Sequence, residues 1–489
     1  MDTGTILEAA AAGDPARTAL IIDGRSISYG ELAQTVRQCA AGLAARGVRA
    51  GRRVAVVDVG SLLSIATLLG AARIGAAAAL MNPALTPPEI RGLLKSADCA
   101  DVAVAGEPFA DRVRDAGAAT VLTFTDLAGD GRSSPSPAEP GTEALVLFTS
   151  GTTGLPKPIG ISDRQLIRRI KGMAAPFRAD SKPSVGLMCV PFFHVGGALG
   201  TLGSLYSGNT SVVQQRFDAG EWLRLVSQHR VTTTFMVPTM LQRILDHPDF
   251  AGADLTSLIA VAYGAAAAPV DLVRRAMAAL PHVAFANVFG QTETLGAYTT
   301  LMPDDHRDPA RAGSVGRPLP GVEVRVVDPE TGDDVNTGTV GELWVHTAQN
   351  VSEGWLHTGD LARQDAQGYI FCSGRLSDTI NRGGEKFGPV EVEEALRTHP
   401  AVRDVAVAGI DDGELGQRVG AAVVACAPVT LEELRSHCRE SIAYFKLPER
   451  LAIVDDIPYT STGKINRREL AALIADASRK SGSANAFPS

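Results

Sequence analysis

The sequence predicts an α/β fold, and three observations carry this prediction. Short β-branched runs alternate with longer amphipathic or alanine-rich runs, a rhythm typical of largely parallel sheets covered by helices. Between residues 322 and 345 the apolar period shortens towards alternation, which indicates antiparallel strands. After Gly374 a new pattern of strands and helices begins. That restart predicts a small α+β unit that forms its own domain.

The predicted elements follow in chain order. A buried strand at residues 54–57 leads into a helix at 61–74 and a second strand at 76–81. Thr86 is the expected N-cap of the next helix, because prolines fit the first turn of a helix. Further strands are predicted at residues 102–105, 144–148, 211–213, 232–237 and 284–288. In the C-terminal part we expect helices at 391–398 and 431–441, and strands at 402–409 and 419–425.

Composition narrows the class of protein. The chain has 489 residues, which suggests about three domain-sized units. Its 46 Lys+Arg against 54 Asp+Glu give a net charge of −8, so nucleic acid is not expected as the main partner. Six scattered cysteines without a Cys-x-x-Cys pair favour a reducing cytoplasm over a disulfide framework or zinc site. We expect a cytoplasmic monomer or homodimer, with no signal peptide and no membrane span.

The strongest motif follows the apolar strand at residues 144–148. It consists of Thr149, Ser150, Gly151, Thr152, Thr153 and Gly154, with Lys157 close behind. Backbone N–H groups and hydroxyls in such a loop can wrap an anion, and Lys157 adds positive charge. The motif lacks the Gly-Lys-Ser/Thr ending of a Walker A loop. Taken by itself, a flexible polar turn is an equally good interpretation.

Further segments lie downstream in a fixed order. They are Pro191–Gly197 (with His194, Val195 and Gly196), Phe289-Gly290-Gln291-Thr292-Glu293, Gly341-Glu342-Leu343, Trp355–Asp360, Gly374-Arg375, Gly383-Gly384-Glu385-Lys386 and Ser461-Thr462-Gly463-Lys464. This ordered set resembles the core motifs of the acyl-adenylate-forming enzymes. That superfamily includes acyl- and aryl-CoA synthetases, peptide-synthetase adenylation domains and firefly luciferase. Each motif is weak alone, but the set extends from Ser26 to Lys464.

The resemblance implies a domain plan and a reaction. Residues 1–376 would form a large N-terminal domain of two α/β subdomains plus a small β-barrel-like sheet. Residues 377–477 would form a small mobile α+β domain, followed by a flexible tail at 478–489. The implied enzyme uses ATP and Mg²⁺ to convert a small-molecule carboxylic acid to acyl-AMP with release of pyrophosphate, and then transfers the acyl group to the thiol of CoA. The alternative is loading of a carrier-protein phosphopantetheine, or of a non-thiol acceptor.

The family's nucleotide site can be carried over residue by residue. The resemblance implies that Thr149–Gly154 and Lys157 hold the β- and γ-phosphates and that Thr292 contacts the α-phosphate. Glu293 would bind Mg²⁺, and Asp360 would accept the ribose hydroxyls with Arg375 nearby. Phe289 would stack on adenine, with the backbone of Gly264, Ala265 and Ala266 on its other side. Asn287 and Gly290 complete the nucleotide set. Lys464 resembles the catalytic lysine, acting with Glu293, Thr292 and His194.

The second half-reaction involves the C-terminal part. Ser377 lies at the family's hinge position, about which the small domain would rotate. Gly383 and Gly384 would border the pantetheine tunnel, where an absent side chain leaves room. Arg382 and Lys386 are candidates for contacts with the CoA nucleotide.

The acid pocket can be sketched from the same resemblance. His194 would gate access of the carboxylate, and the absence of an acidic residue after Phe193 disfavours a free α-amino acid. The implied wall is apolar and suits an aryl or medium-chain acid. It comprises His194, Val195, Gly196, Gly264, Ala265, Ala266 and Leu295. No arginine is evident there to pair with a second carboxylate, which disfavours dicarboxylic acids. The connection from Thr347 to Trp355 is shorter than in the family.

Overall fold

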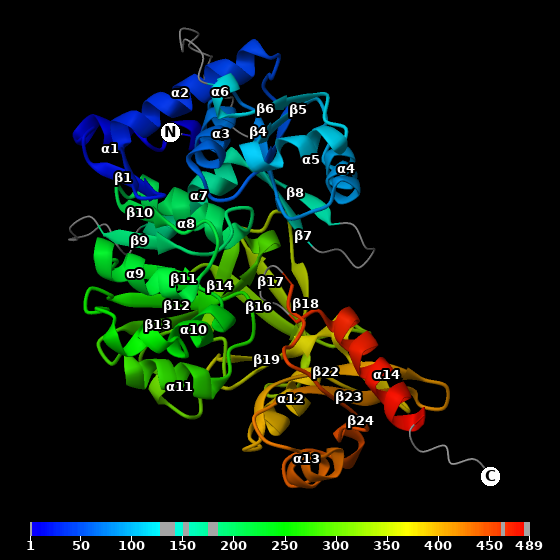
Figure 1. Cartoon of the computed structure of the whole chain (residues 1–489). Coiled ribbons are helices and arrows are strands. Elements are labelled where there is room, and N and C mark those ends of the chain that lie inside the picture. Colours follow the sequence, from blue (N-terminus) through cyan, green and yellow to red (C-terminus); the bar gives the residue numbers. More distant parts are fainter. Residues whose placement is uncertain (1, 128–141, 150–155, 175–183, 461–464, 484–489) are drawn as a thin grey trace. The chain divides into compact units, whose positions relative to one another are not determined.

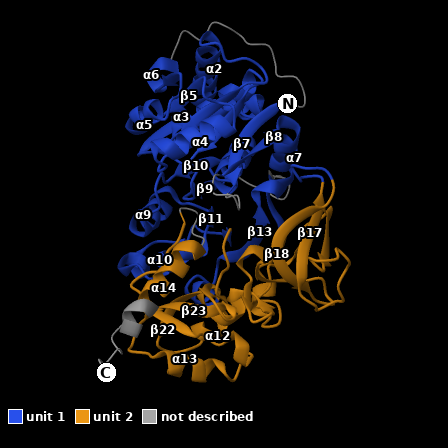
Figure 2. Ribbon diagram, turned by 90° about the vertical axis from the view of Figure 1, so that its right-hand side faces the viewer, with its two compact units in different colours: residues 1–264, 274–298, 348–353 blue, residues 265–273, 299–347, 354–489 orange. Residues whose placement is uncertain are grey.

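The computed structural model describes residues 2–127, 142–149, 156–174, 184–460 and 465–483 (Figure 1). It divides into two compact units, which Figure 2 shows in different colours. Unit 1 comprises residues 1–264, 274–298 and 348–353. Unit 2 comprises residues 265–273, 299–347 and 354–489. Unit 1 therefore includes the short segment 348–353, although in the sequence this segment lies between two parts of unit 2.

One sheet of unit 1 has six strands in the order β6-β5-β3-β4-β7-β8. The bounds are β3 Arg53–Val57, β4 Ala77–Met81, β5 Val102–Ala105, β6 Thr120–Leu122, β7 Glu143–Thr149 and β8 Lys157–Ser162. The first five strands of this order run parallel, and β8 pairs antiparallel with β7. Because the β7–β8 pair closes on Thr149 and Lys157, both ends of the predicted phosphate loop are held together.

The second sheet of unit 1 has the order β14-β13-β12-β11-β9-β10-β1-β2. The bounds are β1 Thr18–Ile22, β2 Arg25–Ser28, β9 Val185–Met188, β10 Thr210–Val213, β11 Thr233–Met236, β12 Ala260–Gly264, β13 Ala284–Gln291 and β14 Gly296–Leu301. Strands β13 to β1 of this order are parallel, and β2 returns antiparallel beside β1. Parallel strands place their carboxyl ends at one edge, where α/β proteins bind ligands.

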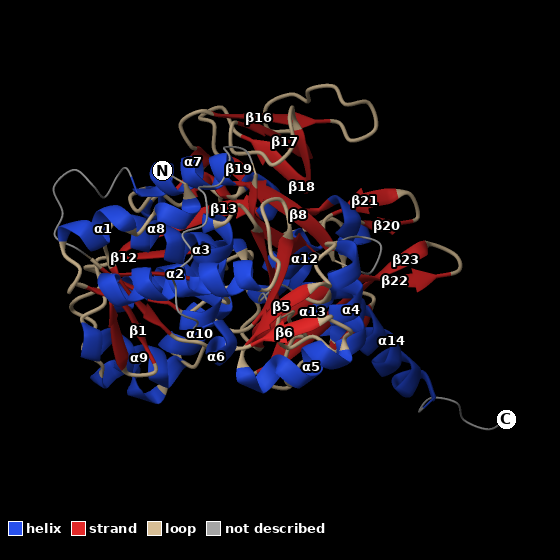
Figure 3. Ribbon diagram, turned by 90° about the horizontal axis from the view of Figure 1, so that it is seen from above, coloured by secondary structure: helices blue, strands red, loops and turns tan. Residues whose placement is uncertain are grey.

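Helices cover these sheets. Their bounds are α1 Glu8–Gly13, α2 Tyr29–Ala45, α3 Leu62–Arg73, α4 Pro87–Ser96, α5 Ala110–Asp115, α6 Phe124–Leu127, α7 Asp163–Ala174, α8 Val195–Tyr206, α9 Ala219–His229, α10 Pro238–Leu245 and α11 Val270–Ala279. Helix α2 packs on α3 (Figure 3). The predicted cap of α4 is present, since the Glu89 carboxylate accepts a 2.7 Å hydrogen bond from the Thr86 backbone N–H. Capping boxes also begin α2 and α3.

Unit 2 contains a four-stranded antiparallel sheet in the order β16-β17-β18-β19. Its strands are β16 Val322–Val327, β17 Gly341–Thr347, β18 Leu356–Gln364 and β19 Ile370–Arg375. The short strand β15 (Arg317–Pro318) pairs with the end of β14. The antiparallel strands predicted between residues 322 and 345 are therefore confirmed.

The C-terminal part of unit 2 is a five-stranded sheet with helices on both faces. Its strands are β20 Ile380–Arg382, β21 Glu385–Phe387, β22 Val402–Asp412, β23 Gly416–Ala425 and β24 Arg450–Ile453, and its helices are α12 Pro389–Arg397, α13 Leu431–Cys438 and α14 Arg467–Ser483. One core lies between the sheet and α12 and α13, and a second lies under α14. The predicted α/β class with a small α+β C-terminal part is confirmed.

The predicted elements agree with the observed ones over the described residues. The predicted surface loop at 129–141 lies outside the described residues. Helix α14 runs to Ser483 and so enters the segment predicted as a tail. Among the described residues, no helix combines the length and apolar character that crossing a membrane requires.

Candidate active site

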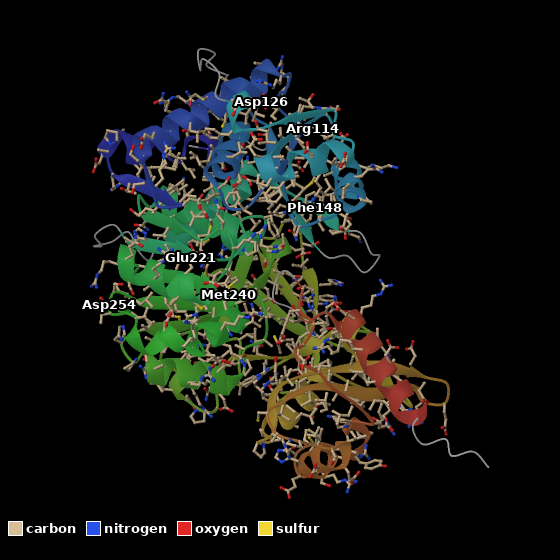
Figure 4. The ribbon with its side chains drawn as sticks, in the orientation of Figure 1. Arg114, Asp126, Phe148, Glu221, Met240 and Asp254 are labelled. Atoms are coloured by element: carbon tan, nitrogen blue, oxygen red, sulfur yellow. The ribbon has the colours of Figure 1, made fainter. Side chains whose placement is uncertain are left out.

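The predicted phosphate loop begins at the end of β7. Phe148, labelled in Figure 4, precedes Thr149, which pairs with Lys157 at the start of β8. Lys157 is exposed, so its ammonium group can reach a ligand held above this end of the sheet. The remaining loop residues of the prediction lie outside the described residues; they are Ser150, Gly151, Thr152, Thr153 and Gly154.

The carboxyl ends of β12 and β13 bring together the next predicted residues. Gly264 ends β12 and pairs with Val288, one residue before Phe289. A Cβ atom at Gly264 would lie 2.1 Å from the Val288 carbonyl oxygen, so only glycine fits there. Asn287 is buried and its side chain bonds that of Tyr263. This edge therefore has a glycine that lets two backbones approach closely, next to a buried polar pair.

The ring of Phe289 is oriented by its neighbour on β14. Tyr298 meets it edge to face, with ring centroids 5.4 Å apart and an interplanar angle of 73°. Phe289 itself stays half-buried. Gly290 lies against Gly296, whose carbonyl oxygen would be 2.0 Å from a Cβ at Gly290. The aromatic ring is thus held in place while part of its surface is accessible.

A tight turn presents Thr292 and Glu293. Residues Thr292–Thr294 form one turn of 3₁₀-helix, and Leu295 ends it in the left-handed region with φ of 51°. The Thr294 hydroxyl donates to the Gln291 and Gly296 carbonyl oxygens at 3.0 and 2.7 Å. The Thr292 and Glu293 side chains are half-buried and belong to a turn that partly buried hydrogen bonds fix.

The acid-pocket residues of unit 1 start helix α8. His194 is the N-cap residue, its ring centroid lies 4.4 Å from that of Phe193, and Val195 and Gly196 form the first turn. A Cβ at Gly196 would lie 2.8 Å from the ring of Phe235 at the end of β11. The ring of Phe235 therefore lies directly beside Gly196. Leu295, another residue of the predicted pocket wall, is fully buried.

In unit 2, Asp360 and Arg375 lie opposite each other on β18 and β19. The Arg375 Nε lies 2.7 Å from Asp360 Oδ1, and its Nη1 donates to the Thr358 carbonyl oxygen at 3.1 Å. The Thr358 hydroxyl accepts from the Asp360 N–H at 3.0 Å. Asp360 is only 7% exposed. The carboxylate is therefore positioned by both its backbone and a cation.

Ala265 adopts a conformation unusual for alanine. Its φ is +66°, in the left-handed region, directly after the Gly264 that ends β12. This conformation costs a non-glycine residue about 1 kcal/mol. Strain of this kind often accompanies functional sites, where the backbone rather than the side chain meets the ligand. Ala266 follows it and has no positive φ.

A model of the family described as "AMP-binding enzyme" matches residues 7–356. The chain belongs to this family. A second model, described as "AMP-binding enzyme C-terminal domain", matches residues 391–464. The resemblance to acyl-adenylate-forming enzymes is thereby confirmed.

Individual AMP-binding enzymes match over nearly the whole chain. An indoleacetate–CoA ligase from Aromatoleum aromaticum is 32% identical, covering 94% of this chain and 96% of that enzyme. A fatty acid–[acyl-carrier-protein] ligase, ScoC, from Streptomyces coeruleorubidus is 30% identical, covering 94% and 93%. The solved structure of the amide bond synthetase McbA from Marinactinospora thermotolerans has a TM-score of 0.87 at 28% identity, covering 96% and 99%. These relatives use different acceptors.

Ser377, the predicted hinge position, borders a partly buried ion-pair network in unit 2. Ser377 lies in the turn Leu376–Asp378, and its hydroxyl donates to Asp378 Oδ1 at 3.1 Å. Asp378 Oδ2 accepts from Arg467 Nε at 2.9 Å, and Arg467 Nη1 donates to the buried Glu393 at 2.8 Å. The start of α14 is therefore tied to the residue after Ser377. Lys464 lies outside the described residues.

Gly383 and Gly384 form the turn between β20 and β21. Their φ values are +61° and +97°, and Arg382 pairs with Glu385 across the hairpin. Two successive positive φ values are typical of a tight two-residue hairpin. Hairpin geometry alone therefore explains both glycines, independently of a tunnel.

The two cations considered for the CoA nucleotide are engaged in ion pairs. Arg382 Nε lies 2.8 Å from Glu449 Oε2, and both side chains are largely buried. Lys386 Nζ lies 3.0 Å from Glu330 Oε1 at an exposed position. Arg382 is therefore committed to a structural pair, whereas the exposed Lys386 pair is weak and can exchange for a phosphate.

The shortened connection after Thr347 is fixed to unit 1. Gln165 Nε2 on α7 donates to the Asn350 carbonyl oxygen at 3.0 Å, and the Val351 N–H donates to the Glu293 carbonyl oxygen at 2.9 Å. Direct hydrogen bonds thus join α7, residues 348–353 and the Glu293 turn.

The sequence did not predict two residues near these segments. Phe235 faces Gly196, and Arg169 on α7 lies beside Gly296, next to the predicted wall residue Leu295. Both come from elements whose positions depend on tertiary packing. One signal was available: Arg169 interrupts the apolar stripe of its helix.

A separate cavity of about 460 Å³ lies in unit 1 against α9, where Glu221 is labelled in Figure 4. Its lining includes Asp23, Arg216, Glu221 and Arg224. None of the predicted site residues lines it.

Proposed function

We propose that this protein uses ATP to convert a carboxylic acid to acyl-AMP and then transfers the acyl group to the thiol of CoA. In the first step a carboxylate oxygen bonds the α-phosphorus, and the bond to pyrophosphate breaks. In the second step the CoA sulfur bonds the acyl carbon, AMP leaves, and the thiol proton is released. The observation that carries the proposal is the membership of both parts of the chain in the AMP-binding enzymes, together with a CoA ligase related over 94% of the chain.

The described residues fit an adenine nucleotide. Phe289 offers a positioned ring, and Gly264 leaves its strand end free of a side chain. Asp360 is a buried carboxylate whose two oxygens suit the two hydroxyls of a ribose. Lys157 is an exposed cation at the end of the predicted phosphate loop. Phe289 and Lys157 of unit 1 would supply stacking and charge to the nucleotide, and Asp360 of unit 2 would supply recognition of the ribose hydroxyls.

The catalytic roles follow from the charge that the reaction must manage. A carboxylate and a triphosphate repel each other, so cations must lie between them. Lys464 would bridge the two anions, Thr292 would donate to the α-phosphate, and Glu293 would hold Mg²⁺. Mg²⁺, when bound, neutralises phosphate charge and takes oxygen ligands from the nucleotide as well as from protein. Among the described residues, no group of three or more potential metal ligands gathers, which suits an ion held mainly by the nucleotide.

The acid would enter beside His194 and lie along Val195, Gly196 and the Gly264–Ala266 segment. Phe235 adds an aromatic surface next to Gly196. An apolar wall with an aromatic side suits an aryl or medium-chain acid.

A carrier-protein phosphopantetheine is the second candidate acceptor. The ScoC relative, a ligase named for an acyl carrier protein, favours it. Both acceptors present the same thiol chemistry, so residues around the nucleotide do not separate them. A cytoplasmic location and a monomeric or homodimeric state remain predictions from the sequence.

The test is pyrophosphate release across a panel of aryl, short-chain and medium-chain acids, with and without CoA. Mass spectrometry of the products distinguishes acyl-AMP from acyl-CoA. We expect CoA-dependent formation of the thioester, and turnover that ignores CoA would contradict the proposed acceptor. Lys464→Ala should nearly abolish acyl-AMP formation while retaining thioester formation from supplied acyl-AMP. Pyrophosphate exchange at the wild-type rate in that variant would contradict the role of Lys464.

A further inference from the structure

Arg169 is a charged residue on the buried face of α7. It lies in the same stripe as Leu166, Ile170 and Met173, which all contribute to the apolar core of unit 1. Only 8% of Arg169 is exposed. A guanidinium group in such a place loses most of its hydration, so it needs strong hydrogen-bond partners to compensate.

The partners of Arg169 do not provide that compensation. Its Nη1 donates to the Gln349 side-chain oxygen at 2.9 Å, and its Nε is buried without a hydrogen-bond partner. No carboxylate contacts it in the part of the chain that the structure describes. Burial lowers the pKa of the guanidinium to about 10, so the group stays charged at neutral pH. Within the described ranges, this buried positive charge therefore has one neutral hydrogen-bond partner and an unused donor.

The unpartnered Nε lies on one edge of the guanidinium, which it shares with Nη2. Nη1 is occupied by Gln349, which leaves the edge formed by Nε and Nη2. A Cβ atom at Gly296 would lie 3.4 Å from Nη2 and 4.0 Å from Nε, so this edge faces the position where Gly296 lacks a side chain. Two parallel N–H groups on one edge match the two oxygens of a carboxylate.

This edge lies among the segments of the candidate active site. Gly296 directly follows Leu295, the predicted wall of the acid pocket, and packs against Gly290. Gln349 belongs to the segment 348–353, whose Val351 bonds the Glu293 backbone. All of these residues belong to unit 1. The guanidinium is therefore enclosed by the same segments that carry Glu293 and Leu295.

We propose that Arg169 is a specificity-determining residue that binds a second carboxylate of the acid, remote from the carboxylate that is activated. The inference rests on the proposed function and narrows its substrate class to aryl or medium-chain dicarboxylic acids. The arginine missing from the sequence-based list of pocket residues is supplied by α7. The proposal departs from the sequence-based expectation, which disfavoured dicarboxylic acids because no arginine was evident among the pocket residues.

The test compares acids that differ in the remote group alone. Terephthalate is matched with p-toluate, and adipate with hexanoate, in assays of pyrophosphate release. In the wild type, kcat/KM for at least one diacid should exceed that of its matched monoacid by about ten- to hundredfold, the contribution of a charge-assisted bidentate pair. Arg169→Met should remove this preference and leave the monoacid rate unchanged or raised. Arg164→Met, an exposed arginine on the same helix, is the control and should retain the preference.

Thermal unfolding separates recognition from a structural role. The preferred diacid should raise the melting temperature of the wild type but not that of Arg169→Met. The free variant should melt no lower than the wild type, because it loses a poorly compensated buried charge. An equal loss of rate for all acids with a lower melting temperature would show a structural role and overturn the inference. If Arg169→Met raises KM for ATP with every acid, Arg169 binds a phosphate of the nucleotide, and this result would also overturn the inference.

Failure of the inference is distinguishable from failure of the proposed function. If wild-type protein turns over monoacids at least as well as diacids in both pairs, the role of Arg169 is wrong and acid activation stands. If no acid in the panel supports pyrophosphate release, the proposed function is contradicted. In that case the thermal assay still tests Arg169, because a diacid should raise the melting temperature of the wild type but not that of Arg169→Met.

Discussion

Asp360→Asn is the sharpest single test of the nucleotide site. The substitution keeps the size of a side chain that is only 7% exposed, so packing around it should survive. It removes the negative charge opposite Arg375 and replaces one acceptor oxygen with an amide donor. The backbone stays anchored, because the Asp360 N–H bonds to the Thr358 hydroxyl independently of the side chain.

The size of the effect follows from what the carboxylate binds. A hydrogen bond to a charged group contributes about 1.5–3 kcal/mol, and the proposed site has two ribose hydroxyls donating to one carboxylate. Asparagine keeps one acceptor, so the expected loss is about 2–4 kcal/mol, or about 30- to 1000-fold. The lost pairing with Arg375 contributes less, since the arginine side chain is 39% exposed and water screens it. The hydroxyl contacts should therefore dominate.

The assay is pyrophosphate release at varied ATP with saturating acid. We expect KM for ATP to rise and kcat to change less, because the ribose lies away from the reacting atoms. Asp411→Asn, at an exposed position in the same unit, is the control and should behave as wild type. A folded Asp360→Asn variant with kcat/KM for ATP within about threefold of wild type would refute the assigned role.

Two further variants test the backbone and the packing of unit 2 by urea unfolding. Ala265→Gly should stabilise the protein by about 0.5 kcal/mol, because relief of the left-handed strain outweighs the greater freedom of glycine in the unfolded chain. Ala266 has no positive φ, so Ala266→Gly should destabilise the protein. Arg467→Met should cost about 3 kcal/mol, since it leaves the buried Glu393 without its cation and releases Asp378.

Each of these variants has an internal check. Equal signs for the two alanine variants would contradict the strain at Ala265. For the ion-pair network, Arg468→Met replaces an exposed neighbour on α14 and should be neutral. A neutral Arg467→Met would show that the network does not hold the start of α14.

Much of the fold was predictable because its strands carry their own signal. The runs at Val54 and Val102 are β-branched, and each is buried on both faces of a parallel sheet. The strand Ala260–Gly264 lacks that signal, since three of its residues are alanine or glycine, which are not strand formers. It is a strand because β11 and β13 pair with it on both sides. Long-range pairing of this kind is invisible in a local pattern.

The residues of the candidate site also differ in whether a local sequence pattern predicts them. Phe289 and Glu293 were predictable because the motif that contains them resembles a family motif, and the structure places them at the carboxyl end of β13 and in the turn after it. Phe235 and Arg169 were not, since each contributes through a contact with a glycine distant in sequence. The absence of a side chain at Gly196 and Gly296 is informative only once the neighbour that uses the space is known.

Gly383 and Gly384 show how a local and a functional requirement can coincide. A hairpin turn with two positive φ values demands glycine on steric grounds, and Asn381 supports it by accepting the Gly384 N–H at 3.1 Å. The same turn presents bare backbone at the end of a rigid hairpin, which is the surface a pantetheine chain could pass along. A tight hairpin turn and a pantetheine path therefore both favour glycine at these two positions. A Cβ atom added at Gly384 would meet no atom of the described residues within 4 Å. Its steric effect in the second half-reaction would therefore come from the ligand or from a rearranged domain, and the strain of its positive φ would affect folding.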